Sequence, residues 1–461
     1  MTAFLITFAY NCCFNMIDKK DSFNAAYITG ISFIAALGGY LFGFDFAVIA
    51  GALPFLKEQF HFTDVQEGFA TATLALGCIL GCLIAGSISG RFGRKKALML
   101  AAGIFLASSL AMAWAYSSTT FIIARFFAGI GVGMASVLSP MYIAEAAPSQ
   151  MRGRMVAINQ LTIVIGILVT NLVNYSLRNE GDDAWRWMMG LGAVPSALFL
   201  IGVIFLPESP HWLVKAGADE KAKENLQRIG GAGYATDSLA AIKRSLQGER
   251  TKTNYKDIFS KAVWPSVMIG MGLAVFQQFC GINVVFNYTT AIFESVGFNK
   301  EDQLMQTVFI GAVNLVCTLV AIWQVDKLGR KPLMLFGAVG LSILYIISAI
   351  LLQQKSAAAS WTLLAAIGVY AMTLAPVTWV LISEIFPNKV RGAATSIAVI
   401  ALWLSYAVLT FTFPILAKRL GAYTPFYIYA CICIAGFFFV KWKVKETKGK
   451  SLEDMEAVFG H

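Results

Sequence analysis

Long apolar segments alternate with short polar segments along almost the whole chain. Most apolar segments have about 20 residues or more, which is the length that an α-helix needs to cross the hydrocarbon core of a bilayer. The pattern predicts membrane helices at 26–53, 68–89, 97–116, 119–142, 155–176, 187–206, 262–292, 304–325, 332–352, 360–383, 393–416 and 424–442. We therefore expect an all-α membrane protein with twelve transmembrane helices, because a helix satisfies its own backbone hydrogen bonds in lipid.

A longer polar stretch separates the first six predicted helices from the last six. Its part from 215 to 247 is rich in Ala, Lys, Glu and Leu, which is typical of short amphipathic helices. The predicted organisation is a tail at 1–25, an N-terminal six-helix bundle at 26–206, a cytoplasmic helical linker at 207–261, a C-terminal six-helix bundle at 262–443 and a tail at 444–461.

The apolar segment 2–14 is too short to cross a membrane. Lys19 and Lys20 follow it, whereas the basic residues of a signal peptide precede the apolar part. Two interpretations stay open: translation that begins at Met16, and a helix that lies along the membrane surface.

The polar motifs at the helix ends occur twice at one spacing. The segment 90–95 (Gly-Arg-Phe-Gly-Arg-Lys) matches 326–331 (Asp-Lys-Leu-Gly-Arg-Lys), 236 residues later. Two further pairs have offsets of 239 and 238 residues: Glu145 with Glu384, and Glu208 with Glu446. Three matches at one period indicate a duplicated unit. Two repeated bundles of membrane helices are typical of transporters that bind their substrate between the halves.

Composition supports a membrane protein and argues against a nucleic-acid partner. Only 13% of the residues are charged, whereas soluble domains have about 25%. The net charge of +10 comes from Lys and Arg residues that fall in alternate loops and in the C-terminal tail. This distribution follows the positive-inside rule and predicts that both termini are cytoplasmic.

Two charged residues, Asp45 and Arg125, lie well inside the predicted spans. Asp45 is 19 residues, or roughly 29 Å, from the start of the first span. Arg125 is 20 residues, or roughly 30 Å, from Glu145 at the end of the fourth span. The two therefore lie at about one depth, and we expect them to pair. Charges inside a membrane are costly and indicate a functional site; the alternative is a purely structural ion pair.

Several short motifs together resemble the sugar porter family of the major facilitator superfamily. They are Gly-Phe-Asp at 43–45, Val-Ile-Ala-Gly at 48–51, Pro-Met-Tyr-Ile-Ala-Glu at 140–145, Asn-Gln-Leu at 159–161, Pro-Glu-Ser-Pro at 207–210, Gln-Gln at 277–278, Gly-Ile-Asn at 281–283 and Glu-Thr-Lys-Gly at 446–449. The resemblance covers residues 26 to 455 and is strongest to bacterial D-xylose/proton and related pentose and hexose symporters. It implies the major facilitator fold, in which the two halves are related by a pseudo-two-fold axis.

The chain departs from the family pattern at a few positions. Outside the predicted pocket these are Gly90 in place of Asp, His211 in place of Arg, and Lys445 in place of Pro. Within the predicted pocket they are Asn287 where Tyr is frequent, Leu402 where a polar residue is usual, and Tyr406 where Asn is common. The departures in the pocket concern the identity of the sugar more than transport itself.

The resemblance implies import of a monosaccharide, a pentose or a hexose, together with a proton. A neutral sugar is bound best by amides, which donate and accept hydrogen bonds, and by aromatic faces. The candidate substrate-binding residues are Gln160, Gln277, Gln278, Asn283, Asn287, Asn314, Trp379, Trp403 and Phe42. The alternative for any single amide is a hydrogen bond that joins two helices. We expect Gly281 and Pro376 to bend their helices around this site.

The resemblance also implies roles for the charged residues. Family symporters carry an Asp at the place of Asp45, so Asp45 is the candidate proton-coupling residue and Arg125 its partner. The repeated loop residues resemble a cytoplasmic gate, and we expect charge pairs between the halves. The candidate gate residues are Arg94, Glu145, Arg152, Glu208, Asp326, Arg330, Glu384, Arg391 and Glu446. The alternative for the arginines is that they serve only membrane topology.

Other functions are less consistent with the sequence. A passive sugar uniporter needs no buried acid, a sugar sensor of this family usually has a long cytoplasmic tail, and a drug/proton antiporter would require an apolar cavity. An enzyme is not expected, because the chain shows no nucleophile–base pair, metal cluster or phosphate loop. We expect a monomer in a bacterial plasma membrane that needs no cofactor other than the coupling proton. Its expected partners are the sugar and the lipid bilayer.

Overall fold

The computed structural model describes residues 23–248, 258–260, 263–386 and 390–448, without the side chains of 247, 248, 323, 325, 326, 383, 391 and 392. The described part is helical and contains no β-strand. Twelve helical segments in it are long and apolar enough to cross a membrane. The prediction of an all-α membrane protein with twelve transmembrane helices is therefore confirmed. The segment 2–14 lies outside the described residues.

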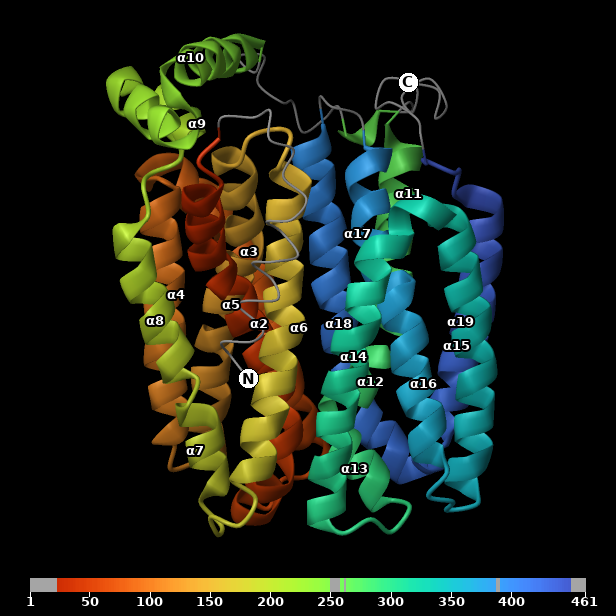
Figure 1. Ribbon diagram of the computed structural model, residues 1–461. Coiled ribbons are helices and arrows are strands. Elements are labelled where there is room, and N and C mark those ends of the chain that lie inside the picture. Colours follow the sequence, from red (N-terminus) through yellow and green to blue (C-terminus); the bar gives the residue numbers. More distant parts are fainter. Residues whose placement is uncertain (1–22, 249–257, 261–262, 387–389, 449–461) are drawn as a thin grey trace.

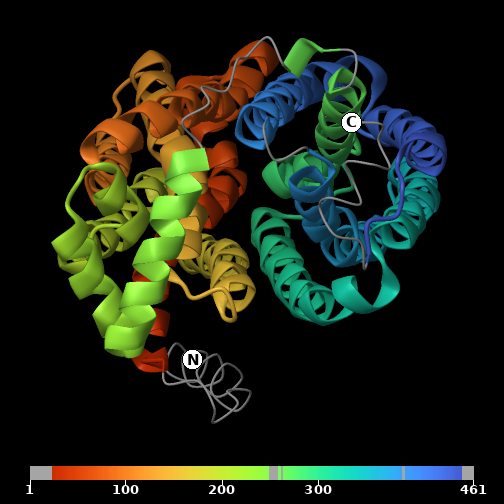
Figure 2. The same cartoon turned by 90° about the horizontal axis from the view of Figure 1, so that it is seen from above.

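The helices form two bundles that lie side by side (Figures 1 and 2). The first contains α2 (Ala25–Phe60), α3 (Asp64–Phe92), α4 (Arg94–Ala113), α5 (Ser118–Ala146), α6 (Arg152–Ser176), α7 (Ala184–Gly190) and α8 (Ala193–Phe205). The second contains α11 (Trp264–Phe279), α12 (Ile282–Asn287), α13 (Thr289–Glu294), α14 (Lys300–Leu328), α15 (Arg330–Gln353), α16 (Ala359–Met372), α17 (Leu374–Ile385), α18 (Arg391–Leu420) and α19 (Thr424–Lys443).

The segment between the bundles folds into α9 (Pro210–Lys215) and α10 (Asp219–Gly248), which lie at one end of the first bundle (Figure 1). We call this end the linker side and the opposite end the far side. The linker segment was expected to form short helices, and α10 consists of two helical stretches that meet at a break at Gly231, where φ is 80°. His211 lies in α9.

Contacts of the backbone hold the linker on the first bundle. The Asn24 N–H, just before α2, donates to the Ile229 carbonyl in α10 at 2.8 Å. The Asn225 amide donates to the Glu208 carbonyl at 2.9 Å. The first contact joins α10 to the residue before α2, and the second joins it to the segment that follows α8.

Side-chain caps set where helices begin on the far side. Thr63 and Gln66 form a capping box at the start of α3, in which each side chain bonds the backbone N–H of the other residue. As a result α3 begins at Asp64, four residues before the predicted apolar span. Glu67 therefore lies inside the helix and is only 3% exposed.

Two membrane helices are broken near the middle, as the sequence predicted around Gly281 and Pro376. The chain leaves α11 and starts α12 at Gly281, where φ is 86°. A side chain there would be strained and would also meet the Tyr429 ring, since a Cβ atom would lie 2.3 Å from it. The second break separates α16 from α17 at Thr373, three residues before Pro376. Both breaks direct backbone and amide groups into the second bundle.

Candidate functional site

A buried ion pair joins α2 to α5 in the first bundle. Arg125 Nη1 lies 3.3 Å from Asp45 Oδ1, and both residues are fully buried. Arg125 Nη2 also lies 3.5 Å from the Asp45 carbonyl oxygen. Asp45 Oδ2 and Arg125 Nε have no hydrogen-bond partner among the described residues. The depth comparison placed these two residues at one level, and the structure brings them into contact.

This ion pair makes few hydrogen bonds to compensate its two charges for the loss of hydration. A buried ion pair balances the cost of desolvation only when its remaining polar atoms are also hydrogen-bonded. Here one carboxylate oxygen and one guanidinium nitrogen are left without partners. A proton on Asp45 would remove one of the two buried charges, so the arrangement can respond to proton binding.

Three of the predicted amides form a hydrogen-bonded chain across the break between α11 and α12. The Gln278 amide donates to Gln277 Oε1 at 3.3 Å, and the Asn283 amide donates to Gln278 Oε1. The Gln277 amide lies 3.5 Å from the Ala375 carbonyl oxygen in α17. All three amides are at least 94% buried. The chain therefore connects the two broken helices of the second bundle.

Asn287 makes a contact that the sequence did not indicate. Its amide donates to the Tyr406 hydroxyl at 2.7 Å, and its Oδ1 atom has no partner. Asn287 and Tyr406 are the positions where the chain departs from the family pattern in a reciprocal way, Asn for Tyr and Tyr for Asn. The side chains at these two positions are in contact. One amide and one phenol therefore lie between α12 and α18, with the amide on α12 and the phenol on α18. This reciprocity was the signal that could have identified Tyr406.

Aromatic rings connect the two halves beside these amides. Phe42 from α2 contacts Trp403 from α18, with ring centroids 5.8 Å apart, and Trp403 contacts Tyr406 at 5.8 Å. Phe46 from α2 contacts Tyr406 at 5.8 Å and Phe286 at 5.6 Å. Phe46 directly follows Asp45 in α2, so the helix that carries the buried acid also contributes a ring to this contact between the halves.

The remaining predicted binding residues lie on three other helices. Gln160 is half-buried on α6, and Asn314 is buried on α14. Trp379 lies on α17 and is 43% exposed. Among the described residues, no recorded hydrogen bond joins these three to Gln277 or its neighbours. The convergence of all nine predicted residues therefore stays a prediction.

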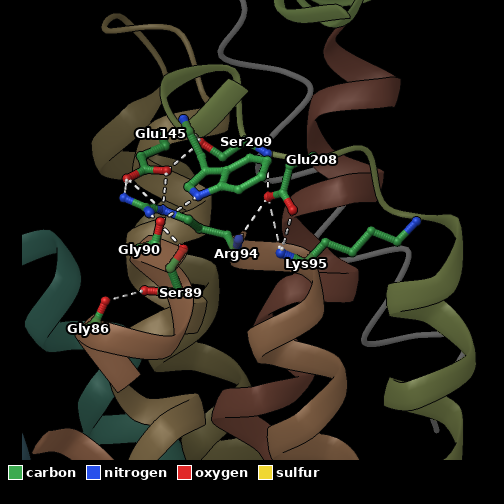
Figure 3. Close-up of polar contacts among 9 residues, drawn as sticks. Gly86, Ser89, Gly90, Arg94, Lys95, Glu145, Glu208 and Ser209 are labelled. Atoms are coloured by element: carbon green, nitrogen blue, oxygen red, sulfur yellow. Dashed lines mark hydrogen bonds and ion pairs between the residues drawn. The ribbon is translucent and has the colours of Figure 1, made fainter. Parts of the chain in front are cut away.

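The first half has a charged cluster on its linker side (Figure 3). The Arg94 guanidinium pairs with Glu145, with Nη2 2.9 Å from Oε1, and the Ser209 hydroxyl donates to Glu145. The Glu208 carboxylate accepts hydrogen bonds from the backbone N–H groups of Arg94 and Lys95, at 2.9 and 3.2 Å. Glu208 thus caps the start of α4, where the helix dipole favours a negative charge.

The second half repeats this cluster. The Glu446 carboxylate accepts from the backbone N–H groups of Arg330 and Lys331 at the start of α15, both at 3.0 Å. Arg330 Nη2 lies 3.3 Å from Glu384 Oε1. Gly93 and Gly329 precede the two capped helices with φ of 100° and 90°. The duplication seen in the sequence is therefore also a duplication of contacts.

The charge pairs recorded for the candidate gate residues lie within each half. Arg94–Glu145 joins α4 to α5, and Arg330–Glu384 joins α15 to α17. The expected pairs between the halves stay a prediction. Arg152 is exposed at the start of α6. The side chains of Asp326 and Arg391 lie outside the described residues.

The pKa of Glu446 is lower than its ordinary value of 4.5. Partial burial raises the pKa, but hydrogen bonds from the N–H groups of Lys448, Arg330, Lys331 and Thr447 lower it and outweigh the burial. These bonds favour the ionised form. Their contribution to stability is fully present above pH 4.5 and is lost as the pH falls through the lowered pKa.

Glu446→Gln should loosen the segment after α19 at neutral pH, because a neutral amide is a weaker partner for four N–H groups. The amide protons of Arg330, Lys331 and Lys448 should exchange with solvent about fivefold faster, as expected for a lost helix cap. Hydrogen-exchange mass spectrometry measures this. Glu220→Gln, on the exposed face of α10, is the control and should leave these rates unchanged. Equal rates in both variants would contradict the cap.

On the far side, ion pairs and hydrogen bonds join the two halves. Lys418 Nζ lies 2.9 Å from Asp64 Oδ2, and Lys300 Nζ lies 2.8 Å from Glu58 Oε1. Further contacts are Arg178 Nη2 with Glu301 Oε1 at 2.9 Å, the Asn171 amide with the Thr307 carbonyl at 2.7 Å, and the Thr290 hydroxyl with the Ala50 carbonyl at 2.9 Å. The halves are therefore in close contact on the side away from the linker.

The fold and these contacts can be compared with those of known proteins. The sequence profile of the sugar (and other) transporter family matches residues 31–459. The chain belongs to this family. It is 38% identical to the D-xylose-proton symporter of Escherichia coli (strain K12), over 95% of this chain and 97% of that protein. It is 36% identical to the arabinose-proton symporter of Bacillus subtilis (strain 168), over 96% of this chain and 97% of that protein.

Solved structures of sugar transporters show the same fold. The inward open conformation of the xylose transporter XylE from E. coli superposes with a TM-score of 0.84, at 37% identity, over 94% of this chain and 100% of that chain. XylE bound to 6-bromo-6-deoxy-D-glucose superposes with a TM-score of 0.80, at 37% identity, over 95% and 100%. The prediction of the major facilitator fold is confirmed. The protein is a multi-pass membrane protein of the sugar transporter type.

Proposed function

We propose that the protein imports a monosaccharide together with a proton by alternating access, without a chemical step. The observation that carries this proposal is the contact between two kinds of buried groups. The ion pair of Asp45 and Arg125 lies next to Phe46, whose ring touches Tyr406, and Tyr406 accepts a hydrogen bond from Asn287. A titratable group thus precedes, in α2, a ring that contacts the hydrogen-bonded partner of a candidate sugar-binding side chain of the second half.

The chemistry of the buried amides supports a sugar as the substrate. Amide groups offer both donors and acceptors, and the unpartnered Asn287 Oδ1 atom can accept a hydroxyl proton. The rings of Phe42 and Trp403 offer apolar faces to the C–H groups of a pyranose. We propose that the nine candidate binding residues form one site for a pentose or a hexose. The similar proteins named as D-xylose and arabinose symporters support this class.

We propose that Asp45 carries the coupling proton. When Asp45 is ionised, it holds Arg125 at 3.3 Å. When it takes up a proton, this attraction is lost, and the balance between the two states of the transporter changes.

We propose that the linker side faces the cytoplasm and that the structure represents an inward-facing state. The positive-inside distribution of Lys and Arg supports the orientation. The contacts between the halves on the far side, and the TM-score of 0.84 with the inward open form of XylE, support the state. The charged clusters within each half would then be a gate in its open form. Arg152, Asp326 and Arg391 are proposed to join the gate when it closes.

The proposal is tested by sugar uptake into membrane vesicles that contain the purified protein. Radiolabelled D-xylose, L-arabinose and D-glucose are each supplied with an inward proton gradient, with and without a protonophore. We expect accumulation of at least one sugar above its external concentration, and loss of that accumulation with the protonophore. Uptake that only equilibrates, with or without the protonophore, would indicate a uniporter. Binding without uptake would indicate a sensor.

Gln278→Ala should weaken sugar binding, because Gln278 connects Gln277 to Asn283. Its removal leaves buried amides without partners, which costs about 1–3 kcal/mol, or roughly 5- to 150-fold in the dissociation constant. Isothermal titration calorimetry with the transported sugar measures this. Gln303→Ala is the control, since Gln303 is equally buried but bonds the Phe298 carbonyl on the far side. Equal affinity in both variants would contradict the proposed site.

A further inference from the structure

One buried carboxylate has no role in the proposed function. Glu67 lies in the first turn of α3 on the far side and is 3% exposed. Its cation partner is Lys57 from α2, with Nζ 3.2 Å from Glu67 Oε2. The Lys57 side chain is 47% exposed, so water weakens the charge that faces Glu67.

Two carboxylates near Glu67 carry the same charge as Glu67. Asp64 on α3 and Glu294 at the end of α13 both act on it as negative charges. The phenol of Tyr288, between α12 and α13, is also within electrostatic reach. α18 contributes Lys418, which is paired with Asp64 at 2.9 Å. Glu67 is therefore a buried acid with one partly hydrated cation and two negative neighbours.

Glu67 lies in a part of α3 that packs closely against the second half. Next to it, Gly68 packs so closely on α18 that a Cβ atom there would lie 2.5 Å from the Phe411 carbonyl oxygen. The ring of Phe69 contacts the ring of Phe411 at a centroid distance of 4.9 Å. These contacts bring α18 of the second half against the turn of α3 that carries Glu67, which is 3% exposed. When the halves part on the far side, as alternating access requires, the same contacts open and water reaches the carboxylate.

We propose that Glu67 is a second proton-binding group, distinct from Asp45, and that its protonation favours closure of the far side. Ionised Glu67 is costly to bury beside two negative charges, and it is hydrated when the halves part. The ionised form therefore favours the open far side, and the neutral form favours the closed one. The proposal rests on the alternating-access part of the proposed function.

Closure of the far side on protonation of Glu67 would favour import. A proton taken up from an acidic exterior binds Glu67 while the far side is open. The neutral residue then allows α3 and α18 to come together, so an acidic exterior favours the step that encloses the substrate. The effect does not need Asp45, since the two carboxylates lie on different helices and Asp45 has its own partner, Arg125.

The experiment measures the distance across the far side as a function of pH, without transport. Spin labels are placed at Tyr116→Cys and Gln354→Cys, both exposed at the far ends of the two halves, in a background whose reactive native cysteines are replaced. Asp45→Asn is included so that Asp45 does not titrate. Double electron–electron resonance in lipid nanodiscs then gives the ratio of closed to open far-side distances at pH 5.5 and pH 8.

With Glu67 present, we expect the ratio of closed to open molecules to rise severalfold from pH 8 to pH 5.5, because protonation removes a charge that is costly to bury in the closed form. Adding Glu67→Gln should remove this dependence and favour the closed form at both pH values. Adding Glu58→Gln instead should preserve it, because Glu58 also pairs across the halves but its side chain is 61% exposed.

A second variant tests the proposal independently of Glu67→Gln. Lys57→Met removes the cation that favours ionised Glu67, so the midpoint of closure should move to higher pH. The proposal is overturned if the pH response persists in Glu67→Gln, or if no response is seen with Glu67 present. A failure of proton-coupled uptake would instead refute the role of Asp45, and would leave the far-side distances and their pH response unchanged.

Discussion

Asp45→Asn is expected to abolish accumulation of sugar against its gradient while sugar exchange across the membrane continues. The asparagine keeps an oxygen that accepts from Arg125, which lies 3.3 Å from Asp45 Oδ1, so the helices α2 and α5 should stay together. It removes the proton-binding group, so the proton gradient no longer drives the sugar. With one proton per sugar, one pH unit supports about tenfold accumulation, and the variant should fall to a ratio of about one.

The measurement compares net uptake under a proton gradient with exchange of labelled for unlabelled sugar, in the same vesicles. Asp183→Asn is the matched control, because Asp183 is an exposed acid that pairs only with the neighbouring Arg186. This control should accumulate sugar like the unaltered protein. If Asp45→Asn still concentrates sugar, Asp45 is not the coupling residue and its pair with Arg125 is structural.

Much of the fold could be predicted because lipid imposes a simple pattern. A helix that crosses a membrane must be apolar over about 20 residues, so its core is visible in the sequence. The ends of helices were less predictable, since capping residues such as Thr63 and Gln66 are polar and extend α3 beyond its apolar span. This is why Glu67 was placed outside the membrane helices although it is buried.

The site was predictable where one residue type is rare in its surroundings. Asp45 and Arg125 were identified because charges are almost absent from the spans, and a helix rise of about 1.5 Å per residue was enough to compare their depths. The contact of Asn287 with Tyr406 depends on how α12 packs against α18, which no local pattern encodes. The same holds for the gate, where the sequence shows which charges are repeated but not which helix each arginine reaches.

Arg125→Met is expected to destabilise the protein more than Gln278→Ala. It leaves the carboxylate of Asp45 fully buried without its cation, and removing one partner of a buried ion pair costs about 3–5 kcal/mol. Thermal unfolding in detergent, followed by the fluorescence of a thiol-reactive dye, should show a clearly lower midpoint. Protonation of Asp45 should recover part of the loss, so the midpoint of the variant should rise as the pH is lowered.

The double variant Asp45→Asn/Arg125→Met tests whether Arg125 stabilises the protein by balancing the charge of Asp45 or by packing. It contains no buried charge at this place, and replacing a buried ion pair by neutral groups of similar volume is often neutral or stabilising. We therefore expect a midpoint close to that of the unaltered protein, with no dependence on pH from this site. Sugar accumulation should still be absent, because no proton-binding group has been restored. A double variant as unstable as Arg125→Met alone would mean that Arg125 stabilises the bundle by packing, not by balancing the charge of Asp45.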